Sequence, residues 1–127
     1  MKIPKPAKPK KARDKRKQLK NKADKLWYQK YLKSVCEICG DNYHLQAHHF
    51  YYRSSYGHLR YLEDNHITLC QKHHFVLHHQ DPKKITDRII EVRGQKWYDR
   101  LKEKALTKPK PSYQTIGYYK KQIEKLK

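Results

Sequence analysis

The sequence predicts a small α+β domain that is stabilised by bound metal. Two short apolar stretches, residues 43–47 and 66–69, lie between turn residues and have the length of strands, whereas the flanking segments have the spacing of helices. Only 36% of the 127 residues are apolar, which is little for a conventional core. Such chains usually need a disulfide, a metal or a partner. Three cysteines beside nine histidines favour a metal.

Four segments are expected along the chain. Residues 1–13, where lysine first alternates with proline, predict a disordered basic tail. Residues 14–33 lack proline and space apolar side chains by three or four, which predicts a basic helix whose aromatic end packs on the domain. Residues 34–106 hold every cysteine and histidine and form the domain with its following helices. Residues 107–127 contain a Lys-Pro repeat and form a basic extension, either a short helix or a mobile tail.

Three helices are expected between the second strand and this extension. Residues 71–80 form the first of them. Asp81 followed by Pro82 predicts the start of the next, because a capping residue and then proline at the first helical position is a common helix start. We expect Gly94 to end this helix and a third helix to continue through Trp97.

The net charge of +19 is concentrated at the two ends of the chain. Residues 1–33 have 14 lysines and arginines against two acidic residues, and residues 107–127 have six against one. Residues 34–106 are nearly neutral, with 11 basic and nine acidic residues. This distribution predicts a polyanionic partner, because phosphate contacts release counterions and give sequence-independent affinity. We expect DNA, although a basic arm does not distinguish DNA from RNA; a solubilising or targeting segment is the alternative.

The sequence also predicts a compartment. No apolar run approaches the length of a membrane span, and the N-terminus lacks the apolar stretch of a secretory signal. An odd number of cysteines excludes a closed set of disulfides. We therefore expect a cytoplasmic protein with no membrane partner. Its oligomeric state is not predicted.

Two pairs of candidate ligands with equal spacing, here called hooks, predict a structural zinc site. Cys36 and Cys39 form C-x-x-C, and Cys70 and His73 repeat the spacing about thirty residues later. Two residues between ligands let a tight turn direct both side chains at one ion, and two such hooks complete the tetrahedron of a closed site. The alternative is a reduced, buried cysteine pair with Cys70 on the surface.

Further histidines predict a second, open metal site. His48 and His49 are adjacent, so strand alternation directs them to opposite faces. His74 and His78 are four residues apart and share one face of the expected helix. His48, His74 and His78 would supply three nitrogen ligands and leave a position free, as in catalytic sites. Partly buried polar side chains are the alternative, and we prefer it for the remaining histidines, His44, His58, His66 and His79.

These motifs resemble those of a known family. The C-x-x-C pair, Ala47-His48-His49, Asn65-His66-Ile67-Thr68-Leu69-Cys70 and His73-His74-x-x-x-His78 are similar to motifs of the zinc-containing HNH endonucleases. The resemblance is closest to phage-encoded HNH proteins and NinG-like recombination nucleases. It covers residues 26–101 and is specific over residues 36–78. It implies a ββα-metal (His-Me finger) core with a structural zinc site, in a host cytoplasm if the protein is phage-encoded.

The resemblance also implies roles for individual residues. His49 would be the general base, and Asn65 would tie the loop between the strands so that His49 is correctly aimed. His48, His74 and His78 would hold one divalent ion against the scissile phosphate of DNA, giving 5′-phosphate and 3′-hydroxyl products. Mg²⁺, Mn²⁺, Ni²⁺, Co²⁺ and Zn²⁺ are the candidates, and three imidazoles suit magnesium least. The family's usual fourth zinc ligand is cysteine, so His73 leaves open which of His73 and His74 binds each metal.

Three basic residues of the domain are candidates for contact with nucleic acid. Arg53 and Arg60 lie among tyrosines in the loop between the strands, and Lys72 lies at the start of the following helix. Arginine and lysine in such places contact phosphates, although the tyrosines of this loop equally suit the core. The competing interpretation of the whole chain is a zinc-stabilised DNA-binding module without catalysis. RNA as the substrate is a further alternative.

Overall fold

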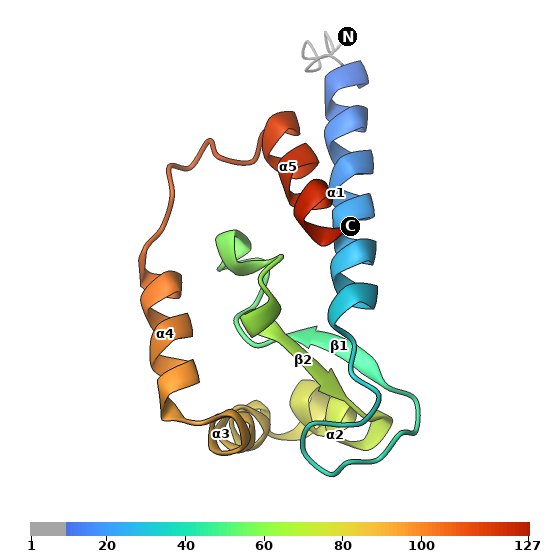
Figure 1. The fold of residues 1–127 in the computed structure, drawn as a ribbon, viewed down its shortest axis with the longest axis vertical. Coiled ribbons are helices and arrows are strands. Elements are labelled where there is room, and N and C mark those ends of the chain that lie inside the picture. The colour runs from blue at the N-terminus through green and yellow to red at the C-terminus, as the bar shows by residue number, and fades with distance from the viewer. Residues whose placement is uncertain (1–9) are drawn as a thin grey trace, which may run out of the picture.

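The computed structural model describes residues 10–127, and this part of the chain is α+β, as predicted (Figure 1). A two-stranded sheet lies among the helices. No helix in these residues is both long and apolar enough to cross a membrane. The elements in chain order are α1 (Lys10–Tyr31), β1 (Gln46–His49), the 3₁₀ turns η1 (Gly57–Leu59) and η2 (Glu63–Asn65), β2 (His66–Leu69), α2 (Gln71–Phe75), the π-helical turn η3 (Val76–Gln80), α3 (Pro82–Arg93), α4 (Gln95–Leu106) and α5 (Ile116–Leu126).

The two strands pair antiparallel, with His48 opposite Ile67 and His49 opposite His66. β2 has the predicted bounds and is buried along its whole length. β1 does not: it begins at Gln46 rather than residue 43 and continues to His49. The difference arises at His44, whose φ of 45° is a left-handed turn conformation that a strand cannot contain.

Helix boundaries follow the local signals closely after β2. The side chain of Asp81 accepts a hydrogen bond from the backbone N–H of Lys84, and Pro82 is the first helical residue of α3. Gly94, at φ 98°, separates α3 from α4. The helix expected over residues 71–80 changes character midway, because its second half is a π-helical turn rather than α-helix.

The N-terminal helix starts earlier than expected. α1 begins at Lys10, inside the segment 1–13 that the sequence predicted to be a tail. Pro9 is the last proline of that segment, so no residue after it blocks helix formation. Residues 1–9 lie outside the described residues, and the tail prediction for them is not addressed.

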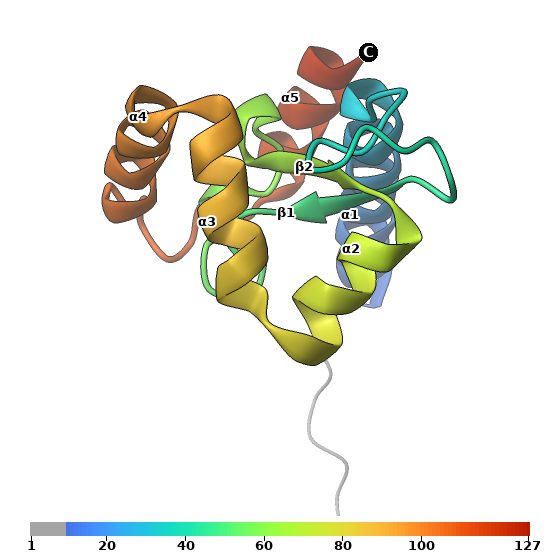
Figure 2. The ribbon, with the colours of Figure 1, turned by 90° about the horizontal axis from the view of Figure 1, so that it is seen from below.

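Buried side chains form two clusters. The first, which includes Ile67 and Leu69 of β2, packs the sheet against α3 and α4 (Figure 2). The second packs α1 against α5, so the C-terminal segment is a helix docked on the N-terminal one (Figure 1). Its buried members are Ala23, Trp27, Tyr61, Tyr119, Ile123 and Leu126. The sheet thus has α1 on one side and α2 with η3 on the other.

Candidate metal centres and active-site cleft

Three cysteines and one histidine meet beyond the end of β2. Cys36 and Cys39 lie in the loop between α1 and β1, Cys70 directly follows β2, and His73 belongs to α2. Their four ligand atoms all lie within 4.8 Å of one another. The two predicted hooks therefore converge, and His73 rather than His74 completes this group.

Distances within this cluster fit a tetrahedral zinc ion. Zinc–sulfur bonds of about 2.3 Å and zinc–nitrogen bonds of about 2.0 Å put two sulfurs about 3.8 Å apart and a sulfur and a nitrogen about 3.5 Å apart. The Sγ atoms of Cys39 and Cys70 are 3.7 Å apart. His73 Nδ1 is 3.6 Å from Cys36 Sγ and 3.3 Å from Cys70 Sγ. The cluster can hold a structural metal such as zinc.

A buried carboxylate ties this loop to β2 and α3. Glu37 accepts a hydrogen bond of 2.7 Å from the backbone N–H of Thr68 and two of 2.8 Å from the Arg93 guanidinium. Burial raises the pKa of Glu37, but hydrogen bonds and charge from Lys33 and Arg93 outweigh it and bring the pKa below its ordinary value. The ionised carboxylate thus holds the first hook in place.

His48, His74 and His78 form a second group of ligand atoms within 4.8 Å of one another. His48 reaches it from β1, and the other two reach it from α2 and η3. The closest pair, His78 Nε2 and His48 Nδ1, is 3.2 Å apart, and two nitrogens on one tetrahedral zinc lie about 3.3 Å apart. π-Helical turns such as η3 are often found at functional sites. These three imidazoles fit a divalent transition metal.

His48 is the most buried ligand candidate of this histidine group. Burial, and after it the proximity of His74 and His78, lowers the pKa of His48 to about 3. Its Nε2 is buried without a hydrogen-bond partner among the described residues. A buried polar atom of this kind calls for an ion or a water molecule, and a neutral imidazole is the form that binds metal.

His49 faces the opposite side of β1, as strand alternation predicted. Its ring stacks on Trp27 of α1, with centroids 4.0 Å apart and planes 6° from parallel. Nε2 lies 2.9 Å from the carbonyl oxygen of Arg60, and since a carbonyl only accepts, Nε2 carries the proton and donates. Nδ1 then keeps a free lone pair. Burial lowers the pKa of His49 to about 4, so the ring is neutral at physiological pH.

Asn65 is fully buried and holds the loop between the strands. Its Oδ1 accepts a hydrogen bond of 2.7 Å from the backbone N–H of Tyr51. Its Nδ2 donates at 3.2 Å to the carbonyls of Tyr51 and Leu59. Leu59 precedes Arg60, whose carbonyl orients His49, so Asn65 fixes the part of the loop that sets the His49 ring.

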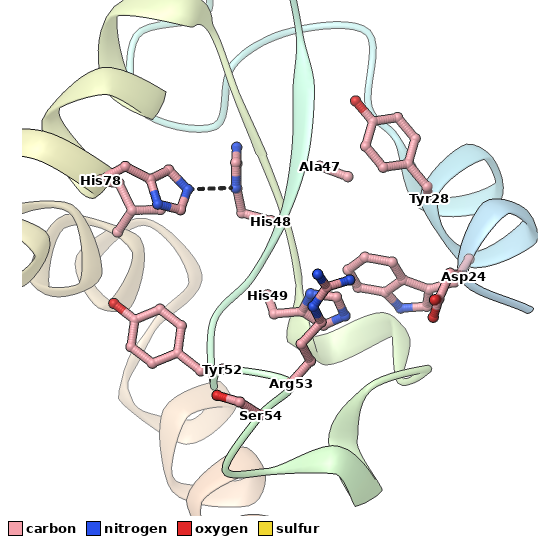
Figure 3. Close-up of a pocket in the computed structure, with 11 residues that line it drawn as sticks. Asp24, Tyr28, Ala47, His48, His49, Tyr52, Arg53, Ser54 and His78 are labelled. Carbon is pink, nitrogen blue, oxygen red and sulfur yellow. Dashed lines mark hydrogen bonds between the residues drawn. The ribbon is translucent and has the colours of Figure 1, made fainter. Parts of the chain in front are cut away.

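A cleft of about 470 Å³ joins the two sides of β1 (Figure 3). His48 and His78 line one part of it and His49 another. Arg53 enters from the loop between the strands and lies beside His49 (Figure 3). The other residues that line the cleft come from α1, β1, the loop between the strands and η3: Asp24, Trp27, Tyr28, Ala47, Tyr52, Ser54 and Leu77. A candidate base and a candidate metal group therefore share one solvent-accessible space.

The three predicted nucleic-acid contacts have different surroundings. Arg53 is exposed at the cleft, and its charge lowers the pKa of His49 after the effects of burial and Arg60. Lys72 is exposed on α2. Arg60 is buried, and its guanidinium donates two hydrogen bonds of 2.6 Å to Asp24. Arg60 thus forms an internal ion pair with Asp24 and is not exposed to bind phosphate.

The remaining histidines lie outside both groups of candidate metal ligands. His58 donates to the carbonyls of Lys104 and Ala105 at the end of α4. His66 is buried and donates to the carbonyl of Tyr28. His44 occupies the left-handed turn before β1, and His79 is exposed on η3.

Sequence reasoning missed the contribution of α1 to this site. Trp27 stacks on His49 and donates to the carbonyl of Leu62, and Asp24 holds Arg60. The available signal was Asp24, one of two acidic residues within a basic helix, three residues before a tryptophan. That spacing places both on one helix face, but nothing local indicates that the face meets β1.

Comparisons of the chain with protein-family models, with curated proteins and with solved structures returned no match. The functional argument therefore depends on the geometry of the site and on the motifs themselves.

Proposed function

We propose that this protein is a metal-dependent endonuclease of the HNH class, with a ββα-metal core formed by β1, β2 and α2 with η3. Its substrate is the phosphodiester backbone of DNA. The observation that carries the proposal is that adjacent residues of β1 project to opposite faces into one cleft. His48 lies close to His74 and His78, of which His78 also lines the cleft, and His49 presents a free Nδ1 lone pair.

Each side chain has a defined task in this reaction. His49 Nδ1 takes a proton from the water that attacks phosphorus, because Nε2 is already committed to the Arg60 carbonyl. Trp27 and Asn65 keep the ring in this orientation. Arg53 lies exposed beside the base and contacts the phosphate next to the one that is cleaved. The products carry 5′-phosphate and 3′-hydroxyl ends.

His48, His74 and His78 would hold the catalytic ion. A bound divalent ion supplies Lewis-acid polarisation of the phosphate and stabilises charge on the leaving oxygen. Three imidazoles without a carboxylate favour zinc, nickel, cobalt or manganese over magnesium. The Cys36, Cys39, Cys70 and His73 group holds a separate structural zinc.

Cleavage of supercoiled plasmid by the zinc-loaded protein tests the proposal. We expect conversion to nicked and linear forms with an added divalent ion, and none when EDTA has removed it. His49→Ala should lower the cleavage rate by at least about 100-fold, the lower range for losing a general base, and should leave DNA binding unchanged. His79→Ala is the matched control, because His79 is an exposed histidine outside both clusters.

A non-catalytic DNA-binding module is the second candidate, and the charge of +19 favours it equally. The same assay separates the two. A mobility shift without cleavage under every ion tested would exclude the nuclease and favour the binding module. Equal loss of binding and cleavage in His49→Ala would exclude His49 as the base. Cleavage of RNA in preference to DNA would change the substrate assignment.

A further inference from the structure

The N-terminal half of α1 presents a row of basic side chains that leads to the cleft. Their spacing of three and four residues places them on one helix face. The same spacing continues to Asp24 and Trp27, which line the cleft. Row and cleft therefore lie on the same side of α1. The residues of this basic row are Arg13, Arg16, Lys17 and Lys20.

The basic row forms a second concave surface, where α1 and α5 lie side by side (Figure 1). It lines a groove of about 350 Å³ together with Asn21, Gln114 and Tyr119. Arg13, Arg16 and Lys17 are exposed, and Lys20 is half-buried. The helix of the basic row is held rigidly, because Tyr119 and Ile123 of α5 are buried against the middle of α1.

Acidic residues do not cancel this charge. The carboxylate that shares the helix face, Asp24, is occupied by two hydrogen bonds from Arg60. Asp14, next in sequence to Arg13, projects about 100° away from it around the helix. Among the residues that the structure describes, the groove lining contains four cationic side chains and no anionic one.

We propose that the basic row binds the phosphate backbone of double-stranded DNA, alongside the stretch that enters the cleft. This assignment rests on the proposed nuclease function. Arg13 lies eleven residues before Asp24, which is about 16 Å along a helix. That length corresponds to about five base pairs of duplex. The row thus holds the backbone within about half a helical turn of the scissile phosphate.

A duplex fits this surface better than a single strand. Proteins that bind single strands stack bases on exposed aromatic rings along a basic groove. Tyr119, the aromatic residue in this groove, is only 3% exposed and packs against α1. The surface therefore offers charge at helical spacing without a stacking platform, which suits a rigid backbone of regularly spaced phosphates.

Salt-dependent binding to a 24-base-pair DNA duplex tests the basic row. The full-length, zinc-loaded chain with His49→Ala is used, so that binding is measured without cleavage. The test variant combines Arg16→Gln, Lys17→Gln and Lys20→Gln. The control combines Lys15→Gln, Lys22→Gln and Lys25→Gln, which removes the same charge from the other exposed side of α1. Glutamine has nearly the same helix propensity as lysine and arginine.

We expect the test variant to reduce the slope of log affinity against log salt by about 2.7, since each lost phosphate contact contributes about 0.9. The loss of affinity at 0.1 M salt should exceed the loss at 1 M salt by on the order of 500-fold, since the slope change of about 2.7 acts over one decade of salt. The control should change the slope by less than about 1. Equal slopes for the two variants would overturn the proposal that the basic row binds DNA. A larger loss of affinity for an RNA duplex than for a DNA duplex would overturn the choice of DNA as the ligand.

Single-turnover cleavage by chains that retain the wild-type His49 separates this proposal from the proposed nuclease function. The same triple substitutions should raise the half-saturating protein concentration and leave the rate at saturation unchanged. If plasmid is never cleaved but the salt slopes differ as expected, the proposed nuclease function is wrong and the proposal that the basic row binds DNA is supported. If plasmid is cleaved and the test and control variants have equal salt slopes, the proposal for the basic row is wrong and the nuclease function is supported.

Discussion

His49 is oriented by residues that come from two separate parts of the chain, α1 and the loop between the strands. Trp27 covers its ring face, and the Arg60 carbonyl accepts the proton of Nε2. Arg60 is in turn held by Asp24, so α1 controls both the face and the edge of the imidazole. Burial of this kind is a positioning device, because it leaves the ring a single hydrogen-bonding arrangement.

Asp24→Asn should destabilise the protein by about 2 kcal/mol, because a charge-assisted pair to a buried guanidinium is typically worth about 1.5–3 kcal/mol. Urea unfolding measures this as a lower midpoint. Asp14→Asn is the matched control, since Asp14 is exposed on the same helix and forms none of the ion pairs found in the described residues. Equal midpoints for the two variants would mean that the Asp24–Arg60 pair contributes no stability.

Asn65→Ala should cost about 3 kcal/mol, because three hydrogen bonds of about 1 kcal/mol each are lost inside the protein. Amide exchange at Tyr51, whose N–H loses its acceptor, should accelerate. Asn65→Asp keeps that acceptor and loses the two donated bonds, so it should protect the Tyr51 amide while still lowering cleavage. Unchanged exchange at Tyr51 in the alanine variant would contradict the assigned role of Asn65.

Regular elements of this domain are too short to be stable alone. Each strand has four residues and α2 has five, whereas isolated hairpins and helices of this size are unstable in water. The cysteine cluster connects the loop before β1, the end of β2 and α2 at one point. A metal bound there would supply the free energy that the sparse core does not.

Cys39→Ser should lose one equivalent of zinc and several kcal/mol of stability, since structural zinc contributes about 10–16 kcal/mol of binding free energy in small domains. Cys39 is exposed, so little packing is lost with its sulfur. Metal analysis and thermal unfolding, each with and without a chelator, check this. With excess chelator the wild type and the variant should unfold alike. A wild type unaffected by chelator would argue against a structural metal.

Elements set by local signals were predictable, and those set by distant contacts were not. Neighbouring residues alone predict the start of α3 at the Asp81 cap, its end at Gly94 and the bounds of β2. The start of β1 depended on one left-handed residue, His44, which the alternating pattern does not reveal. The convergence of the cysteine hooks was encoded in their spacing. By contrast, the Asp24–Arg60 pair spans 36 residues, and no periodicity in the sequence indicates it.

Residues 10–127, which the structure describes, form two packed units that meet at the cleft. One contains the sheet, α3, α4 and the cysteine cluster, and the other pairs α1 with α5. The basic helix α1 is therefore docked on α5, and this pair contributes Trp27 and Asp24 to the site. Anything that loosens α5 should act on His49 through α1.

Ile123→Ala tests this coupling, because Ile123 is buried between α5 and α1. Removing its side chain should cost about 2–5 kcal/mol. Amide exchange should accelerate mainly along α1, and cleavage should fall as Trp27 loses its support, while zinc content stays at the wild-type level. Ile89→Ala makes the same chemical change in the first cluster. It should accelerate exchange in β2 and α3 instead, so the same exchange pattern in both variants would show that the two units unfold as one.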